Sequence, residues 1–180
     1  MKKRGQIWVS AALYIALGII VISVVLTAGL PLINKIQAKN TLLQSKNVMF
    51  ELDSTIRGVM LEGAGSKRPV YVEVEKGELI IDPETDSKKR ILWTFSSKYN
   101  PGIEEGAQIK EGNLLITNQK IGNEYEINII LDLTNFLGGA GLRYDDEASK
   151  KTIAGAYNLV IEHVRKSEAE GGQYLNIKEA

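Results

Sequence analysis

The feature that most constrains this chain is an uncharged, apolar stretch close to its N-terminus. No charged side chain occurs between Arg4 and Lys35, and the residues from Ile7 to Leu26 are almost all apolar. This run has roughly the 20 residues that a helix needs to cross the hydrocarbon core of a bilayer. Because lipid offers the backbone no hydrogen-bond partners, the run is predicted to be a helix.

Residues around the apolar run predict its orientation in a membrane. Lys2, Lys3 and Arg4 crowd its N-terminal side, and basic residues remain on the cytoplasmic side of a membrane helix. Trp8 stands near the start of the run, where interfacial aromatic residues are common. We therefore expect a single-pass membrane protein with a cytoplasmic N-terminus and with the residues beyond Gly29 outside the membrane.

The residues leave three fates open for this apolar segment. A secretory signal would be cut near Thr27-Ala28-Gly29, although the apolar region of such signals usually spans about 7–15 residues. An uncleaved signal anchor would keep the whole segment. In the third case the chain is cut ahead of the apolar run, at Lys3-Arg4-Gly5-Gln6, and the helix is retained.

This junction resembles the class III signal peptide of archaeal type IV pilin-like proteins. The basic residue before Gly5 and the glutamine after it both match that pattern. The resemblance implies that a prepilin-type peptidase cuts between Gly5 and Gln6, so that Gln6 begins the mature subunit. Many pilins carry glutamate at the fifth residue after the cut, where this chain has Ser10. A minor pilin, an archaellin-like subunit and a related cell-surface protein therefore all remain open.

Small side chains recur within the apolar run at intervals of four residues. They are Ala12 and Ala16, followed by Ser23 and Thr27. Such spacing lets the backbones of two helices approach closely, which makes these positions candidates for helix packing. Small residues are also common in membrane helices in general, which is the alternative explanation.

A second helical pattern follows the apolar run. Pro31 lacks a backbone donor, which predicts a kink near the outer membrane boundary. Beyond it an apolar stripe recurs at helical spacing. Its members are Leu42, Met49, Leu52, Ile56 and Val59. The polar residues assigned to other faces are Lys39, Lys46, Asp53 and Arg57. The helix is expected to end at Gly63-Ala64-Gly65 and to need an apolar surface to lie on.

From Arg68 onward the apolar period changes to two, which predicts short antiparallel strands. The expected strands cover Val70–Val74, Glu78–Ile81 after a tight turn at Lys76-Gly77, Ile91–Phe95, Leu114–Thr117, Tyr125–Leu133 after a turn at Gly122-Asn123, and Gln173–Ile177. The segment 152–164 fits both a helix and a strand, and Gly155, Asn158 and its β-branched residues favour a strand.

The expected fold class is α+β, with a long kinked N-terminal helix packed on a C-terminal antiparallel β-sheet domain. The chain divides into a leader peptide at residues 1–5 and a transmembrane or filament-core helix at 6–30. An amphipathic continuation follows at 31–63, and a β domain outside the membrane occupies 66–180.

Composition removes several kinds of site. The chain has 22 basic and 22 acidic residues, so it lacks the positive charge of a protein that binds nucleic acid through phosphates, and no nucleic-acid partner is expected. The absence of cysteine excludes disulfides, thiolate metal sites and a cysteine nucleophile. The single histidine, His163, gives little basis for acid–base or zinc chemistry. No Asn-x-Ser/Thr acceptor for glycosylation occurs.

Two acidic clusters are candidates for cation binding. The cluster Asp82–Asp86 has oxygen ligands at alternate positions, but Ser87 and Trp93 replace the glycine and glutamate that a calcium loop requires. It is interpreted as a solvated turn between strands. The second cluster, Asp145-Asp146-Glu147, is followed by Lys150-Lys151 and is interpreted as an exposed loop. No metal ligand is predicted.

Nothing in the sequence indicates catalysis. His163 is expected on the surface or on an edge strand, and no Gly-x-Ser-x-Gly motif is present. The glycine-rich segment 138–141 lacks the Lys and Ser/Thr of a phosphate-binding loop, so a turn is expected there. The chain is therefore not expected to be an enzyme or to need a cofactor.

Together these patterns predict a structural subunit of a type IV pilus-like surface filament, assembled through its apolar helix after leader cleavage. The expected partners are copies of the chain or related pilins, the membrane, the prepilin-type peptidase and the pilus assembly machinery. A single-pass, membrane-anchored binding module is the alternative. It would keep the same helix but would act as one copy.

Overall fold

The computed structural model of the 180-residue chain describes residues 3–83, 88–167 and 172–180, with side chains described from Trp8 onward. The chain forms two compact units, residues 1–37 and 38–180. The first is helical throughout its described length, and the second combines the end of that helix with a β-sheet. The predicted α+β class is confirmed.

One helix, α1 (Lys3–Glu62), accounts for the whole N-terminal part of the described chain. The backbone is helical on both sides of Pro31, so the proline does not end the helix. In the first unit no side chain from Trp8 to Ala28 is buried. This half of α1 is therefore apolar on all sides and packs against nothing within its own unit.

The second half of α1 is amphipathic, as its sequence predicts. The predicted stripe of Leu42, Met49, Leu52, Ile56 and Val59 is buried in the core of residues 38–180. The prediction that Asp53 lies on an exposed polar face of the helix is wrong, because only 7% of the residue is exposed. It lies one residue beyond Leu52, at the border of the stripe, where a paired carboxylate can be covered.

The end of α1 is fixed by two glycines and a serine. Gly63 and Gly65 both have positive φ (99° and 93°), which a helix C-terminus favours and a side chain would resist. The Ser66 hydroxyl donates to the carbonyl oxygens of Val59 (2.5 Å) and Gly63 (2.7 Å). These bonds satisfy carbonyls that the last helical turn leaves open, and the predicted stop at Gly63 is confirmed.

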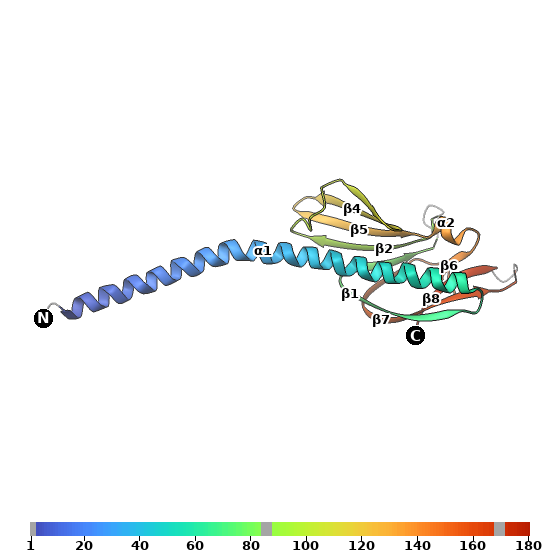
Figure 1. The fold of residues 1–180 in the computed structure, drawn as a ribbon, viewed down its shortest axis with the longest axis horizontal. Helices are drawn as coiled ribbons and strands as arrows, with labels where there is room; N and C mark the ends of the chain where they lie inside the picture. Colours follow the sequence, from blue (N-terminus) through green and yellow to red (C-terminus); the bar gives the residue numbers. More distant parts are fainter. Residues whose placement is uncertain (1–2, 84–87, 168–171) are drawn as a thin grey trace. The chain divides into compact units, whose positions relative to one another are not determined.

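The rest of the second unit is a single sheet, with the described strands in the order β3-β4-β5-β2-β1-β7-β8-β6 (Figure 1). The strands are β1 (Lys67–Asp82), β2 (Arg90–Ser97), β3 (Gln108–Glu111), β4 (Leu114–Ile121), β5 (Glu124–Asp132), β6 (Gly141–Tyr144), β7 (Lys151–Arg165) and β8 (Gln173–Glu179). A short helix, α2 (Thr134–Leu137), connects β5 to β6. Among the described strands, neighbours pair antiparallel except for β6 and β8, which are parallel.

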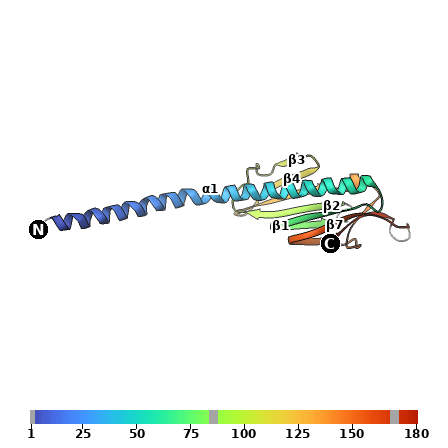
Figure 2. The same ribbon diagram turned by 60° about the horizontal axis from the view of Figure 1, so that its bottom comes forward.

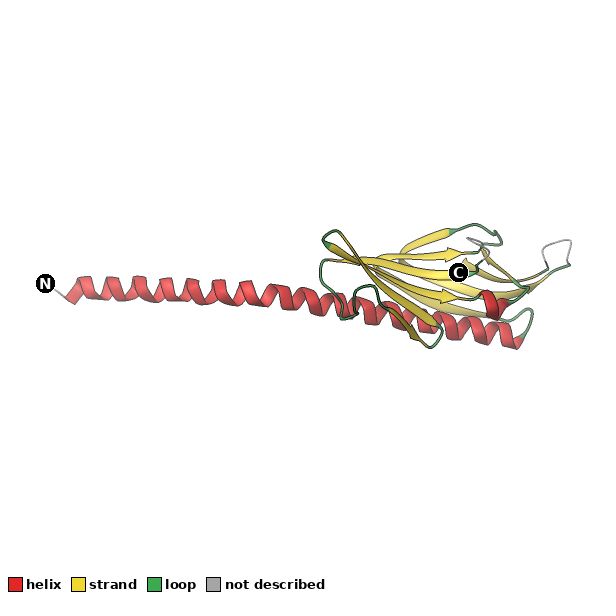
Figure 3. Cartoon of the chain, turned by 90° about the horizontal axis from the view of Figure 1, so that it is seen from above, coloured by secondary structure: helices red, strands yellow, loops and turns green. Residues whose placement is uncertain are grey.

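One face of this sheet is apolar and lies against α1 (Figures 2 and 3). The register aligns apolar side chains in rows across neighbouring strands. One such row is Leu79, Trp93, Ile129 and Ile116, from β1, β2, β5 and β4. All four side chains are buried. The opposite face is more exposed, as Tyr71 illustrates with 52% of its surface accessible.

The predicted tight turn at Lys76-Gly77 is wrong, because β1 continues through it as one 16-residue strand. A register shift between Val74 and Leu79 marks an irregularity in its pairing with β7. Gly77 has φ +86° there and lies against β2. A glycine with positive φ permits a bulge as well as a hairpin turn, so the local sequence does not distinguish them.

The segment 152–164 is a strand, β7, which confirms the preferred assignment. β8 and the turn at Gly122-Asn123 between β4 and β5 are also confirmed. The structure adds β3, β6 and α2, which the sequence analysis did not predict. Each has only four residues, too few for a periodic pattern to emerge.

Gly77 provides a test of the close approach of β1 to β2. In Gly77→Ala the new Cβ would lie 2.0 Å from the Thr94 carbonyl oxygen and 2.6 Å from Phe95 Cβ. We expect the free energy of unfolding to fall by at least about 3 kcal/mol, from backbone strain plus overpacking. Urea unfolding in detergent, followed by the fluorescence of buried Trp93 in a Trp8→Phe background, measures this change.

Gly106→Ala is the matched control. Gly106 also has a positive φ, +76°, but nothing lies within 4 Å of a Cβ placed there. Backbone strain alone should cost about 1 kcal/mol. Equal losses for the two variants would contradict the close approach of β1 and β2 at Gly77.

Candidate functional site

The apolar half of α1 is the first candidate site. Among the residues that the structure describes, one helix is long and apolar enough to span a membrane, and its most apolar 18-residue window is wholly unburied. Trp8, at 79%, and Tyr14, at 75%, are among its most exposed apolar side chains. An apolar surface of this extent requires an apolar surrounding, which supports attachment to a membrane.

The four predicted packing residues all lie on this exposed half. Ala12 and Ala16 are exposed. The Ser23 hydroxyl donates to the Ile19 carbonyl oxygen and the Thr27 hydroxyl to that of Ser23, each at 2.7 Å. Because both hydroxyls bond within their own helix, they do not require a polar partner on another helix. Any role in packing would rest on their small size.

The leader junction adjoins this helix. Lys3, Arg4, Gly5 and Gln6 belong to the helical backbone of α1, while their side chains lie outside the described part of the chain. Met1 and Lys2 also lie outside it. The predictions of a cut at Gly5 and of membrane orientation by the basic residues therefore rest on the sequence.

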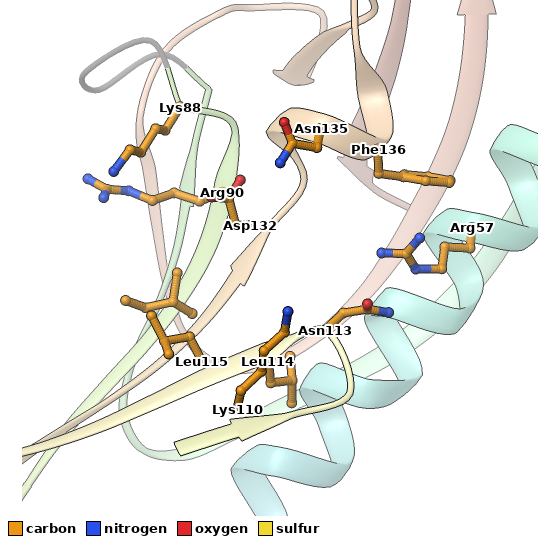
Figure 4. A pocket seen from close by; sticks show the side chains of 11 residues that line it. Arg57, Lys88, Arg90, Lys110, Asn113, Leu114, Leu115, Asp132, Asn135 and Phe136 are labelled. Atoms are coloured by element: carbon orange, nitrogen blue, oxygen red, sulfur yellow. The ribbon is translucent and has the colours of Figure 1, made fainter. Parts of the chain in front are cut away.

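The second candidate site is an open cavity of about 600 Å³ within residues 38–180. It lies where β4 begins and β5 ends, between the end of the sheet, α1 and α2 (Figure 4). Cations, amides and apolar side chains share its lining, which consists of Arg57, Lys88, Arg90, Lys110, Asn113, Leu114, Leu115, Ile130, Asp132, Asn135 and Phe136. No pattern in the sequence predicts this cavity.

Arg57 is held in the cavity wall by contacts on two sides. Its Nε donates to Asp53 Oδ1 (2.7 Å), one helical turn earlier. Asn113, in the β3–β4 turn, donates from Nδ2 to the other carboxylate oxygen of Asp53 (2.7 Å). The Arg57 guanidinium also stacks over the Phe136 ring, 4.3 Å from its centre. Asp53 thus ties α1 to the β3–β4 turn and orients Arg57.

The β3–β4 turn is joined to α1 by two further contacts. Lys46 forms an ion pair with Glu111. A Cβ placed on Gly112 would lie 3.3 Å from the Phe50 ring, which shows how closely the turn approaches the helix. These contacts give the cavity a fixed wall on this side.

Arg90 forms the opposite part of the wall together with Asp132. The Arg90 Nε donates to Asp82 Oδ2 (2.9 Å), and Asp82 is 3% exposed. Asp82 was the first residue of the possible calcium loop, whereas the structure uses it in an ion pair between β1 and β2. Residues 84–87, which include the rest of that acidic cluster, lie outside the described residues.

The end of β5 and the start of α2 are shaped by polar contacts. Partial burial alone would raise the pKa of Asp132, but hydrogen bonds from Thr134 and the nearby Lys88 and Arg90 hold it below the usual 3.8. The Lys89 ammonium donates to the carbonyl oxygens of Gly138 (2.8 Å) and Ala140 (2.6 Å). Residues 138–140 thus form the predicted turn after α2, with the carbonyls of Gly138 and Ala140 accepting from Lys89, and Gly141 begins β6.

The prediction for His163 is wrong. It lies on β7, which pairs with β1 on one side and β8 on the other, and only 3% of the residue is exposed. Its Nε2 is 2.6 Å from the amide nitrogen of Gln173, and its buried Nδ1 has no hydrogen-bond partner among the described residues. His163 is therefore a buried residue of the sheet's inner face, where its register partner is Leu175.

The second acidic cluster is exposed, as predicted. Asp146 is nevertheless anchored, since its Oδ1 accepts from the Tyr174 hydroxyl (2.8 Å) and from Asn176 Nδ2 (3.2 Å). Asp145 and Asp146 both have positive φ (51° and 63°). Within the described ranges, no group of three or more His, Asp or Glu side chains could hold a metal ion.

Comparisons of this chain with models of protein families, with curated proteins and with solved structures found no significant match. The two candidate sites are therefore interpreted from their own residues.

Asp53 provides a test of how the cavity wall is held together. Asp53→Ala removes the acceptor of both Arg57 and Asn113, and we expect it to lower the free energy of unfolding by about 2–4 kcal/mol. The control is Glu51→Ala, on the exposed side of α1. Since both changes introduce the strong helix former alanine, their difference in urea unfolding isolates the buried carboxylate. The control should change stability by less than about 0.5 kcal/mol. Equal losses would mean that Asp53 does not link α1 to the β3–β4 turn.

Proposed function

We propose that this chain is a structural subunit of a type IV pilus-like surface filament. Before assembly the apolar half of α1 would lie in the membrane, with the N-terminus cytoplasmic and residues 66–180 outside. Cleavage between Gly5 and Gln6 would release the subunit for assembly through its apolar helix. The partners would be copies of the chain or related pilins, the prepilin-type peptidase and the pilus assembly machinery.

The observation that carries this proposal is the unburied apolar half of α1, which begins directly at the leader-like junction. Moving such a helix from lipid into water would cost about 25 cal/mol for each Å² of apolar surface. A bundle of identical helices in a filament core keeps that surface away from water. A soluble monomer does not.

Leader cleavage would also change the charge at the membrane. Removal of Lys2, Lys3 and Arg4 reduces the basic residues from 22 to 19, against 22 acidic residues. The three removed charges are those expected to hold the N-terminus on the cytoplasmic side. Their loss would make it easier for the helix to leave the bilayer during assembly.

The alternative is a single-pass, membrane-anchored binding module. The cavity of about 600 Å³ in residues 38–180 favours it, because a binding module needs a site and a filament subunit does not. Both functions are non-catalytic and place the sheet outside the membrane. They differ in whether the leader is removed and whether the helix packs against copies of itself.

Processing gives the first test. Mass spectrometry of the chain from its native membrane should find Gln6 as the N-terminal residue, and Gly5→Val should abolish that cut because the peptidase needs the small residue before the bond. Gly18→Val is the control, since Gly18 lies in the same helix with nothing within 4 Å of an added Cβ. It should be cut normally. An intact Met1, a start near Leu30, or normal cutting of Gly5→Val would contradict the proposed processing.

Helix packing gives the second test. The chain has no cysteine, so single cysteines can report on contacts between copies. A disulfide forms only where two Cα atoms approach within about 7 Å. Oxidation of sheared surface material should therefore cross-link Ala16→Cys, on the small-residue face, several-fold more than Tyr14→Cys on the other side of the helix. Failure to find the chain in sheared material, with a detergent-bound monomer as its sole form, would favour the anchored binding module.

A further inference from the structure

The filament assembly proposed above uses the apolar half of α1 and does not use the cavity between the second half of α1, α2 and the end of the sheet. We propose that this cavity binds an anionic sugar, with the ligand's carboxylate or phosphate group against the cations and its ring against the apolar wall. The cavity lies wholly within residues 38–180. This inference therefore does not depend on leader cleavage or on assembly.

The charge of the lining favours an anion. The described lining includes four cations, Arg57, Lys88, Arg90 and Lys110, against the single carboxylate of Asp132, a surplus of 4 − 1 = +3. Adding Asp53 and Asp82, which pair with the two arginines, still leaves 4 − 3 = +1. The chain as a whole has a formal net charge of zero, so the lining carries a small local excess of positive charge.

Two of these cations can reach a ligand directly. Lys110 makes no hydrogen bond or ion pair with the rest of the described chain, and in Figure 4 its ammonium points into the cavity. The hydrogen bond from Arg57 to Asp53 uses Nε, which leaves the two terminal nitrogens of the guanidinium facing the same space (Figure 4). A planar guanidinium fork matches two oxygens of a carboxylate or phosphate.

The rest of the lining suits the uncharged part of a sugar. Leu115 and Ile130 are register partners on neighbouring strands and are both half-buried, so they present a small apolar surface. They alternate with the buried Leu114 and Leu131, so this surface is on the face of the sheet away from α1, and Lys110 shares that face as the register partner of Leu115. A sugar ring carries C–H groups that pack on such a surface. Its hydroxyls can bond to amides, and the exposed amide of Asn135 lines the cavity.

The size and the fixed walls also fit a small ligand. A cavity of about 600 Å³ lies within the usual range for small-molecule sites. Asp53 fixes the orientation of Arg57, and the contacts of Lys46 and Gly112 hold the β3–β4 turn against α1. Because these walls are set by internal contacts, little reorganisation is needed when a ligand enters.

The test uses the full chain in a zwitterionic detergent without a sugar headgroup. Isothermal titration at about 0.15 M ionic strength, where the Debye length is about 8 Å, measures the binding of glucuronate and glucose 6-phosphate, with methyl glucoside as the neutral analogue. We expect at least one anionic sugar to bind at least about tenfold more tightly than methyl glucoside, the size of one charge-assisted hydrogen bond. Binding of glucuronate alone would identify a carboxylate ligand, and binding of glucose 6-phosphate alone a phosphate ligand.

Two charge reversals locate the binding. Lys110→Glu should weaken the anionic sugar at least about tenfold. Lys98→Glu makes the same charge change at an exposed lysine that does not line the cavity. Lys98 follows β2 at the end opposite to Arg90. Lys98→Glu should change the affinity less than about twofold, since salt largely screens an exposed charge beyond one Debye length. Unchanged urea unfolding of Lys110→Glu would exclude loss of the fold as the cause.

Three results would overturn the proposal. The first is that neither anionic sugar binds, and the second is that the two charge reversals weaken binding equally. The third is that acetate and inorganic phosphate bind as tightly as the sugars, which would mean that the apolar wall adds nothing. None of these results affects the processing or the cross-linking expected of a filament subunit, so the two proposals fail separately.

Discussion

Packing of one face of α1 on the inner face of the sheet is the interaction on which residues 38–180 depend. Without the helix, the row of Leu79, Trp93 and their neighbours would face water across the whole width of an open sheet. Without the sheet, Met49 and Ile56 would be exposed in the same way. Burying both surfaces together contributes about 25 cal/mol for each Å² of apolar area. This shared burial explains why the helix has an apolar stripe here and not an apolar surface all round.

Polar contacts then fix the rotation of α1 about its own axis, which apolar packing alone leaves variable. An apolar stripe alone would tolerate small rotations of the helix about its axis, whereas the carboxylate of Asp53 holds Arg57 and Asn113 at 2.7 Å each. At the helix end Ser66 holds the last turn in a similar way. The cavity lies beside the Asp53 contacts, so the interactions that set the position of α1 also orient Arg57 in its wall.

The first unit meets a different constraint. From Trp8 to Ala28 no side chain is buried, and the hydroxyls of Ser23 and Thr27 bond within the helix. Such a segment needs no specific polar partner, but it does need an apolar environment on every side. Lipid and a bundle of similar helices both satisfy that need, as the proposed filament subunit would require.

The sequence by itself determined the features that arise from local patterns. These are the apolar helical run of membrane length, the amphipathic helix that stops before Gly63, and the strands whose apolar residues alternate. It did not reveal that β1 continues through Gly77, that Asp53 and His163 are buried, or that β6 pairs parallel to β8 at one edge of the sheet. Nor did it reveal the cavity, whose lining comes from α1, β2 and the β3–β4 turn as well as from β5 and α2. Tertiary structure decided these because each depends on which distant strands become neighbours and in what register. Periodicity along the chain specifies the two faces of a strand but does not specify its neighbours.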